Sequence, residues 1–525
     1  MKEENYKFKT KPFKHQFDGW NISKRNKYFA LLMDLGTGKT KVTLDTAAYM
    51  FDNGWINALM VFGNNGSYMN WKEAIEEHFP SHIPVSIGIW SSKNTKKQND
   101  DMYKAITKQG MCLRIFLMNI EAIAYPKGFK AACDFVRNNK TLAVVDESTT
   151  IKNPKSKRTI AAWKIRDLAR ARRILTGSPV DNRPLDAWAQ FEFLCHGALG
   201  FTSYYSFRAQ YAELEQKTVR QKNNLRDIKV VTGYKNLDRL RASISKVSFI
   251  VKKEDCLDLP PKTDMKYYVE LTDEQRRVYE QLKLRSIVEL EGRFRNSKVV
   301  MDAARLFEEL KGFENANISE EFEDGLNDNM SPIVSVKAAI VKLLRLHQIC
   351  CGYVRDDDKV LHQLDSNRIK VLDELLEETR GRTIIWTHFT PDIENIYKHI
   401  SEKYGKESVL TYHGATSREE RDYVKEVFKR GREVDHIKFL IANDKTGGYG
   451  NNWTAATLNI YYSYDYDYNI HHQTQDRIHR IGQTEPVTNV YLIARNTIEE
   501  RMIEVLKNKQ NIAELLTQSN WKNLF

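Results

Sequence analysis

A short apolar segment that runs directly into a glycine-rich turn constrains this 525-residue chain more than any other feature. The segment is Phe29–Met33, and the turn reads Asp34-Leu35-Gly36-Thr37-Gly38-Lys39-Thr40 before a helical pattern begins. Glycines let the backbone approach an anion closely, and the N–H groups at the start of the next helix point toward it. A strand, turn and helix of this kind is typical of a phosphate cradle in a parallel α/β sheet.

Two side chains of this turn would carry chemistry. We expect Lys39 to reach the outer phosphates of a nucleotide and the Thr40 hydroxyl to bind magnesium. The strict pattern has a glycine where Met33 stands. A plain glycine turn between a strand and a helix is therefore the alternative interpretation.

An acidic pair follows another apolar segment about one hundred residues later. Asp146 and Glu147 come directly after Val144-Val145. In a parallel sheet, carboxylates at this place lie at the edge where such folds bind ligands. We expect Asp146 to hold magnesium and Glu147 to orient and activate an attacking water. Acidic turn residues are common, so the pair gains its meaning from the glycine-rich turn.

The chain alternates apolar strands with helical patterns in two separate blocks, residues 1–199 and 366–525. This alternation predicts two α/β lobes with parallel sheets. Residues 200–365 between them contain long charged helical patterns, Asp273–Leu290 and Ser335–Gln348, which we interpret as helical insertions. The predicted strands are Phe29–Met33, Ala58–Phe62, Arg114–Met118, Thr141–Val145, Arg172–Leu175, Thr383–Trp386, Ser408–Tyr412, Lys438–Ala442, Leu458–Tyr462 and Thr488–Ile493.

The net charge of +12 and the pI near 9.1 favour a polyanionic partner such as nucleic acid. A basic run, Lys217–Lys253, could contact such a partner or form a solvated helical face. An acidic stretch, Glu308–Asp328, reads as a loop. The six cysteines form no Cys-x-x-Cys pair, so we expect reduced thiols. We find neither a signal peptide nor a membrane span, and we expect a cytoplasmic location.

Residues Gln475–Gln483 place two arginines three positions apart, which would put Arg477 and Arg480 on one face of a helix. A guanidinium suits a phosphate with developing negative charge, so we expect both to act as fingers on the γ-phosphate. A basic surface helix that contacts only a phosphate backbone is the alternative. Three further candidates complete the set. Gln16 could contact the adenine edge, and Gly448 lies in a glycine turn that could approach a phosphate. Thr176–Pro179 could couple the ATP site to nucleic acid.

These motifs together resemble those of the SWI/SNF-type ATPases, a branch of the superfamily-two helicase-like motors. The resemblance runs from about Pro12 to about Met502. The segments that carry it are Pro12–Trp20, Asp34–Thr40, Asn70-Trp71-Lys72-Glu73, Asp146–Ser156, Leu175–Asn182, Leu259-Pro260-Pro261-Lys262 and Gln475–Gln483.

The resemblance implies an ATP-driven DNA translocase with two RecA-like lobes, which uses ATP and Mg2+. Duplex DNA is favoured as the track, and single-stranded DNA is an alternative. No chromatin-reading motif flanks the motor, so targeting would come from the motor or from a protein partner. A bare motor of Lys-, Asn- and Tyr-rich composition favours a bacterial or phage-infected cell.

Three residues depart from the family pattern. Ser148-Thr149 replaces the usual Ala/Gly-His of the acidic box, which puts the coupling of the lobes in question but leaves the magnesium chemistry in place. Asn451 stands where the family has an apolar residue, so we expect different packing there.

Three functions remain open at this point. The first is a translocase on duplex DNA, and the second is a strand-separating helicase. The third is a nucleic-acid-binding scaffold that uses ATP as a switch with little turnover, and Ser148-Thr149 is its only support.

Overall fold

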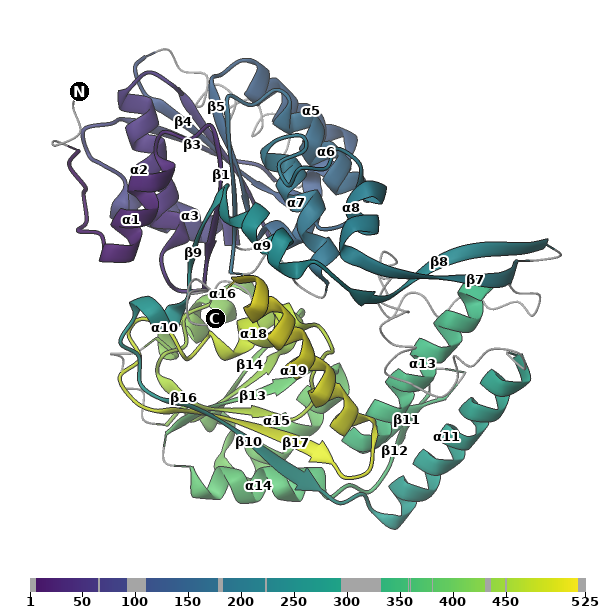
Figure 1. The fold of residues 1–525 in the computed structure, drawn as a ribbon. Helices are drawn as coiled ribbons and strands as arrows, with labels where there is room; N and C mark the ends of the chain where they lie inside the picture. The colour runs from purple at the N-terminus through teal and green to yellow at the C-terminus, as the bar shows by residue number, and fades with distance from the viewer. Residues whose placement is uncertain are drawn as a thin grey trace. The chain divides into compact units, whose positions relative to one another are not determined.

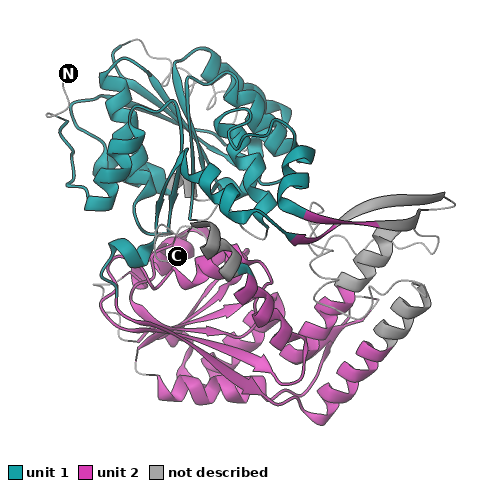
Figure 2. Ribbon diagram, viewed as in Figure 1, with its two compact units in different colours: residues 1–212, 234–259, 509–525 teal, residues 213–233, 260–508 magenta. Residues whose placement is uncertain are grey.

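The computed structural model describes residues 6–517 apart from ten gaps. The gaps are 65–66, 92–109, 178–182, 222–223, 294–331, 357, 359, 380, 430–435 and 449–450. The chain forms two compact units, coloured separately in Figure 2. Unit 1 comprises residues 1–212, 234–259 and 509–525, and unit 2 comprises residues 213–233 and 260–508.

Unit 1 is built on a seven-stranded parallel sheet in the order β3-β4-β2-β5-β6-β1-β9. Helices cover both of its faces, with α1 to α3 on one side and α5 to α7 on the other (Figure 1). Its strands are β1 (Tyr28–Met33), β2 (Ala58–Gly63), β3 (Val85–Ile89), β4 (Leu113–Asn119), β5 (Thr141–Asp146), β6 (Ala171–Thr176) and β9 (Ser248–Val251). Its helices are α1 (Lys14–Ser23), α2 (Lys39–Asp52), α3 (Ser67–His78), α5 (Pro126–Arg137), α6 (Lys157–Arg166), α7 (Ala187–Leu194), α8 (Tyr204–Tyr211), α9 (Leu237–Ser245) and α10 (Lys253–Cys256).

Unit 2 is built on a six-stranded parallel sheet in the order β10-β17-β16-β13-β15-β14. Its strands are β10 (Lys262–Val269), β13 (Arg382–Thr387), β14 (Val409–Tyr412), β15 (Phe439–Asn443), β16 (Ala456–Tyr461) and β17 (Val487–Ala494). Its remaining helices, apart from the insertions, are α14 (Arg368–Glu378), α15 (Thr390–Tyr404), α16 (Arg418–Val427), α17 (Asp444–Gly447), α18 (Tyr468–Gln475) and α19 (Ile498–Thr517).

The predicted fold class, two parallel α/β lobes with helical insertions, is confirmed. All ten predicted strands are present, with bounds that shift by no more than two residues. Apolar segments of this kind are buried on both faces in parallel sheets, and β2, for example, is buried at all six positions.

The middle of the chain contains more strand than we predicted. The helical insertions are α11 (Asp273–Arg293) and α13 (Pro332–Cys351), followed by the short strands β11 (Tyr353–Arg355) and β12 (Leu361–Gln363). The basic run Lys217–Lys253 is not one helical face, because it contributes to β7 (Ala212–Gln221), β8 (Asn224–Tyr234), α9 and β9. The acidic stretch Glu308–Asp328 lies outside the described residues.

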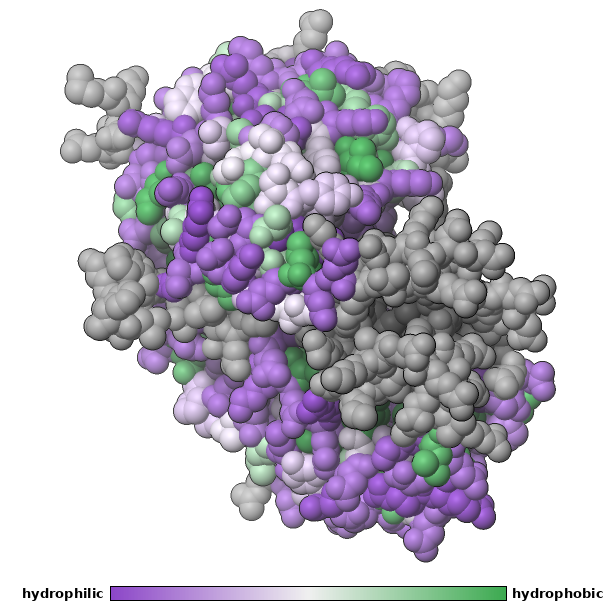
Figure 3. Space-filling view, turned by 45° about the vertical axis from the view of Figure 1, so that its right-hand side comes forward, coloured by the Kyte–Doolittle hydropathy of each residue, from purple (hydrophilic) through white to green (hydrophobic). Residues whose placement is uncertain are grey.

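Each sheet carries its own apolar core. Figure 3 shows that hydrophilic side chains predominate on the face it presents, with apolar ones in small scattered patches. Such scattered apolar side chains are ordinary for a protein surface.

Within the described ranges, no helix combines the length and the apolarity needed to cross a membrane. All six cysteines are free thiols.

Candidate nucleotide-binding site

The glycine-rich turn of unit 1 connects β1 to α2, as the sequence predicts; we call residues Asp34–Thr40 the phosphate loop. Gly36 and Gly38 adopt φ of 83° and 91°, values that a glycine tolerates best. Lys39 is 8% exposed, and its ammonium donates to the Met33 carbonyl at 2.7 Å and to the Asp34 carbonyl at 3.4 Å. Its described partners are neutral carbonyl groups, so its charge can still bind an anion. Thr40, the second residue of α2, is half-buried beside it.

Helix α1 supports the phosphate loop from one side. His15 Nε2 lies 2.8 Å from the Thr37 carbonyl, and Gln16 Nε2 donates to the same oxygen at 3.1 Å. Gln16 Oε1 accepts from the Phe13 N–H at 3.1 Å. A Cβ atom at Gly38 would lie 2.3 Å from Gln16 Nε2, so only glycine fits there. Gln16 thus supports the loop through Nε2 and caps α1 through Oε1, which adds a structural role to the expected contact with adenine.

The other flank of the loop is tied to the start of α10. Asp34 Oδ2 accepts from the Lys253 N–H at 2.9 Å, and the Thr37 hydroxyl donates to the Asp34 carbonyl at 2.7 Å. These bonds fix the loop conformation before any ligand binds. Neither His15 nor the Lys253 backbone was predicted from the sequence, because nothing in a local pattern indicates such distant partners.

Asp146 ends β5 at the same edge of the sheet, separated from β1 only by β6. Its Oδ2 accepts a hydrogen bond from the indole N–H of Trp71 at 2.8 Å. Burial raises the pKa of Asp146, while the Trp71 hydrogen bond and the charge of Lys39 act to lower it. The electrostatic influence of Lys39 indicates that the two predicted site residues belong to one locality.

Glu147 has an unusual backbone conformation, with φ of 57° and ψ of 64°. A non-glycine residue in this left-handed region is uncommon, and such strain occurs often at functional sites. The strained residue is the one that we expected to activate water. The pattern of the sequence predicted its role but not its conformation.

Ser148 and Thr149, which depart from the family pattern in the acidic box, are both buried. Ser148 is fully buried, and its hydroxyl donates to Gln190 Oε1 on α7 at 2.7 Å. Gln190 Nε2 in turn donates to the Asp186 carbonyl at 2.9 Å. The substitution therefore connects the acidic box to α7 within unit 1. A Cβ atom at Gly177 would lie 3.7 Å from Asp34 Cα, so Gly177 lies beside the phosphate loop. Ser178 and Pro179 lie outside the described residues.

In unit 2, the two predicted finger residues do not lie on a helix, which corrects our expectation. Helix α18 ends at Gln475, and the arginines lie in the turns that follow. They nevertheless converge, because Arg477 donates to the Asn451 carbonyl at 3.0 Å and Arg480 donates to the same oxygen at 2.9 Å. A shared acceptor, rather than helical spacing, brings the two side chains together.

The two arginines differ in how completely the protein engages them. Arg477 is 3% exposed and also donates to the Gln473 carbonyl at 2.8 Å. Arg480 is half-buried, and its Nε finds no partner within the described part of the chain. Burial lowers the pKa of Arg480, and the charge of Asp476 opposes that shift. Arg480 is therefore the better candidate for an external anion.

The polar residues around these arginines are used inside unit 2. Gln483 Nε2 donates to the carbonyls of Thr454, Ala456 and Ile478 at 2.9 to 3.2 Å. Gln475 Nε2 donates to the Tyr491 hydroxyl at 2.7 Å. This stretch of sequence therefore builds a turn as well as offering charge.

Gly448 follows α17 and packs closely on its neighbours. A Cβ there would lie 2.6 Å from the Asp444 carbonyl and 3.8 Å from the Ile470 carbonyl of α18. Asn451 is 2% exposed, and its amide donates to the Gly447 carbonyl at 3.2 Å. The polar residue at this position is accommodated by hydrogen bonds. Tyr449 and Gly450 of the predicted turn lie outside the described residues.

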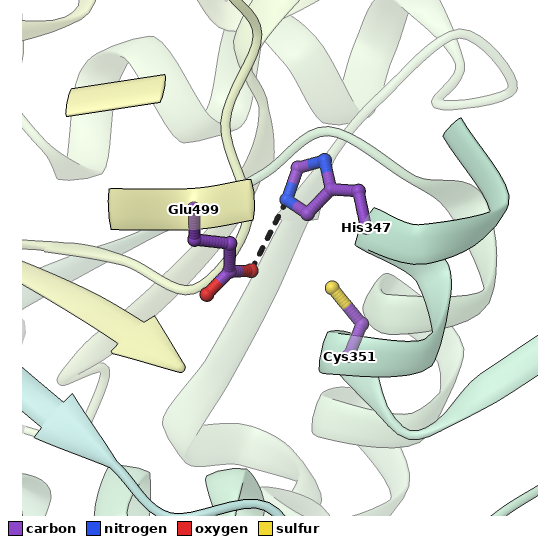
Figure 4. Close-up of side chains that lie close together, drawn as sticks. All are labelled: His347, Cys351 and Glu499. Atoms are coloured by element: carbon purple, nitrogen blue, oxygen red, sulfur yellow. Dashed lines mark ion pairs between the residues drawn. The ribbon is translucent and has the colours of Figure 1, made fainter. Parts of the chain in front are cut away.

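A buried cluster of potential metal ligands lies elsewhere in unit 2. Donor atoms of His347, Cys351 and Glu499 lie within 4.8 Å of one another (Figure 4). Glu499 also forms an ion pair with Arg368, and both side chains are fully buried. Burial acts to raise the pKa of Glu499, but Arg368 and His347 outweigh it, and the pKa is lowered. Because a guanidinium already balances this carboxylate, we interpret the cluster as an ion pair that joins α13, α14 and α19.

Comparison with protein families identifies both halves of the chain. The SNF2-related domain model matches residues 18–318, which is more than half of the chain. The chain belongs to the SNF2 family. The Helicase conserved C-terminal domain matches residues 367–482 of this family member. The resemblance drawn from the motifs is thereby confirmed.

Relatives of this SNF2-family chain are distant and longer. An uncharacterized ATP-dependent helicase of Mycoplasma genitalium is 25% identical over 501 residues, which cover 93% of the chain and 40% of the relative. The TATA-binding protein-associated factor MOT1 of Saccharomyces cerevisiae is 28% identical, with 98% of the chain and 28% of the relative covered. The chain spans between 28% and 40% of the length of the first such relatives.

The Sulfolobus solfataricus SWI2/SNF2 ATPase core in complex with dsDNA is a similar solved structure. The two chains are 21% identical, and the match covers 97% of this chain and 93% of the solved one, with a TM-score of 0.40. A score this low supports no conclusion about function.

Proposed function

We propose that this chain is an ATP hydrolase that uses the energy of hydrolysis to translocate on DNA. The observation that carries the proposal is the pairing, in unit 1, of an ammonium and a carboxylate at one sheet edge. Lys39 presents its charge at the phosphate loop with only carbonyl partners described, and Asp146 lies close enough for Lys39 to influence its pKa. Family membership and relatives named as ATP-dependent helicases support it.

The proposal divides the chain into three parts. Residues 1–199 would bind ATP, residues 200–365 would form the insertions and linker, and residues 366–525 would form the second motor lobe. One of the points at which the chain passes from unit 1 to unit 2 falls between Leu259 and Pro260, within the Leu-Pro-Pro-Lys segment.

Each site residue has a role that follows from its chemistry. Lys39 exchanges its carbonyl partners for phosphate oxygens, and the N–H groups at the start of α2 face the same anion. The residues Asp34, Leu35, Gly36, Thr37 and Gly38 form the cradle, and Gln16 contacts the base. Glu147 orients the attacking water and accepts its proton. Arg480, with Arg477, neutralises charge that develops on the phosphates.

Thr40 and Asp146 fit the demands of a magnesium ion. Mg2+ takes oxygen ligands and usually keeps several waters, so one hydroxyl and one carboxylate are a sufficient protein contribution. When bound, the ion would neutralise charge on the phosphates of ATP. Asp146 is partly buried, and the hydrogen bond from Trp71 restrains its carboxylate.

DNA is the proposed track, with duplex favoured over single strands. The net charge of +12 supports a polyanionic partner, since phosphate contacts dominate such binding. A further protein partner could supply targeting. We place the protein in the cytoplasm of a bacterium or a phage-infected cell, a location that the bacterial relatives support.

ATP hydrolysis measured alone and with duplex DNA, single-stranded DNA and RNA tests the proposal. We expect strong stimulation by duplex DNA, with Lys39→Ala inactive under every condition. Stimulation by single strands alone would favour a strand-separating helicase instead. Tight ATP binding without turnover on any nucleic acid would favour the switch-like scaffold, for which the buried Ser148 bond to α7 is the first place to look.

A further inference from the structure

A tryptophan on α3 donates to the carboxylate at the centre of the proposed site. Trp71 is 1% exposed, and its Nε1 lies 2.8 Å from Oδ2 of Asp146, 75 residues away in the chain. The main-chain N–H of Glu147 also hydrogen bonds to this carboxyl group. Asp146 is thus held by two neutral donors on the protein side.

The sheet explains why α3 reaches this carboxylate. Strand β2 pairs directly with β5, with Val61 opposite Val144 and Phe62 opposite Val145. Helix α3 follows β2, so it begins above the end at which β5 delivers Asp146. The Trp71 ring packs in the core cluster that also contains Val61 and Val144. Packing therefore fixes the ring, and the fixed ring fixes the direction of its N–H group.

An indole N–H suits this place better than a charged donor would. It can only donate, it carries no charge, and it does not titrate in the accessible range. It can therefore restrain one carboxylate oxygen without competing electrostatically with a cation at the same group. A lysine or arginine at this position would orient the carboxylate but would also oppose a cation.

We propose that Trp71 is a positioning residue that orients the Asp146 carboxylate for the magnesium ion of bound nucleotide. The inference rests on the proposed function, because it assumes that Asp146 serves a magnesium–nucleotide complex. Partners that orient a metal-binding group typically change metal affinity by about 10- to 100-fold when they are removed.

The decisive variant is Trp71→Phe, which keeps an aromatic ring in the core and removes only the donor and part of the ring. Trp163→Phe is the matched control, because the indole of Trp163 donates to the Ala189 carbonyl at 3.1 Å, away from the site. The measurement is the binding of a fluorescent ADP analogue as the Mg2+ concentration is varied, together with binding in excess chelator.

We expect Trp71→Phe to need about 10- to 100-fold more Mg2+ for half-maximal enhancement of binding, with binding in chelator unchanged. Trp163→Phe should follow the wild type in both conditions. A purely structural role would weaken binding equally with and without Mg2+, and that outcome would overturn the inference. So would a folded Trp71→Phe protein with wild-type Mg2+ dependence.

A measurement on the intact protein covers the case in which Trp71→Phe does not fold. The chain has nine tryptophans, so 15N labelling gives few indole signals, and replacing the other eight singly assigns that of Trp71 by elimination. We expect this signal to shift when Mg2+ joins the nucleotide complex and in Asp146→Asn, while that of Trp163 stays in place. An unmoved Trp71 signal would overturn the inference. Absence of nucleotide binding by the wild type would instead refute the proposed function.

Discussion

The phosphate loop of unit 1 and the Gln475–Gln483 segment of unit 2 both hold a basic side chain on carbonyl groups, but they lie at opposite ends of their helices. In the loop, Lys39 donates only to neutral carbonyl groups among its described partners, and glycines leave the backbone accessible. In the Gln475–Gln483 segment, Arg477 and Gln483 are almost fully buried and donate to several carbonyls. The loop leads into the first turn of α2, whereas the segment follows the last turn of α18, so the anion site that we propose can use helix N–H groups in unit 1 and only side chains in unit 2.

The largest effect we expect separates the two arginines of that segment. Arg480→Ala should lower kcat by about 10³-fold or more if Arg480 serves as a finger, with little change in stability. Arg477→Ala should lower kcat less and should destabilise unit 2, since the variant removes the donor that the Gln473 and Asn451 carbonyls share. Steady-state ATPase kinetics and thermal unfolding of both variants provide the test. Arg418→Ala, at an exposed arginine, is the control. Equal kinetic losses at 477 and 480 would abolish the distinction.

Glu147→Gln should lower ATP turnover by about 10²- to 10⁴-fold while ATP binding persists, because only the proton acceptor is lost. Single-turnover hydrolysis and equilibrium nucleotide binding measure the two quantities separately. Glu77→Gln changes an exposed carboxylate of unit 1 and should leave both unchanged. Normal turnover in Glu147→Gln would remove Glu147 from the site.

A buried carboxylate of unit 2 should make stability depend on pH. Asp392 is 2% exposed, and burial raises its pKa to about 7 despite the hydrogen bond from Ser463. The folded state therefore holds this proton more tightly than the unfolded state, so the stabilisation is present at low pH and is lost as pH rises from about 4 through about 7. Asp392→Asn resembles the protonated form and should gain about 2–4 kcal/mol relative to the wild type at pH 8.

Denaturant unfolding of both proteins at pH 5 and pH 8 checks this expectation. The difference between them should appear at pH 8 and shrink at pH 5. Nucleotide binding should follow no such trend if Asp392 belongs only to the internal polar groups of unit 2. A difference that is the same at both pH values would contradict the raised pKa.

The smallest effect should come from Gln483→Ala. Its amide satisfies carbonyls of Thr454, Ala456 and Ile478, and its oxygen accepts from two backbone N–H groups. Leaving such buried groups unpaired costs about 1–3 kcal/mol, so unfolding should occur at lower denaturant concentration. Gln363→Ala, on exposed β12, should have a much smaller effect. A loss of nucleotide affinity without a loss of stability would assign Gln483 a role in binding rather than in supporting the turn.

Sequence reasoning predicted the strands that are buried on both faces, because continuous apolar runs leave little ambiguity. In the two large sheets it missed β3, β9 and β10, and the positions of these strands explain why. All three are edge strands of their sheets: β10 is largely exposed, β3 is mostly half-buried, and β9 has only four residues. An exposed edge does not need an apolar run, so composition there resembles that of a loop or a charged helix.

The sequence predicts the residue types of the candidate site but not the residues that form hydrogen bonds to them. The Lys39 turn and the Asp146 pair are local patterns that are visible in the sequence. The bond from Trp71 to Asp146 and that from His15 to the phosphate loop connect residues far apart in the chain. The helix predicted through Arg477 and Arg480 failed for a similar reason. The Trp453 N–H donates to the Arg477 carbonyl, a tertiary bond that a helical period cannot reveal.

The left-handed backbone at Glu147 has a consequence for evolution under selection. A side chain at φ of 57° costs about 1–3 kcal/mol that glycine would recover in part. A laboratory screen for heat resistance alone would therefore favour Glu147→Gly, and under the proposed role of Glu147 the selected proteins would be more stable but would not turn over ATP. The chain keeps a glutamate there at the expense of its own robustness, which is the trade-off expected where selection acts on turnover.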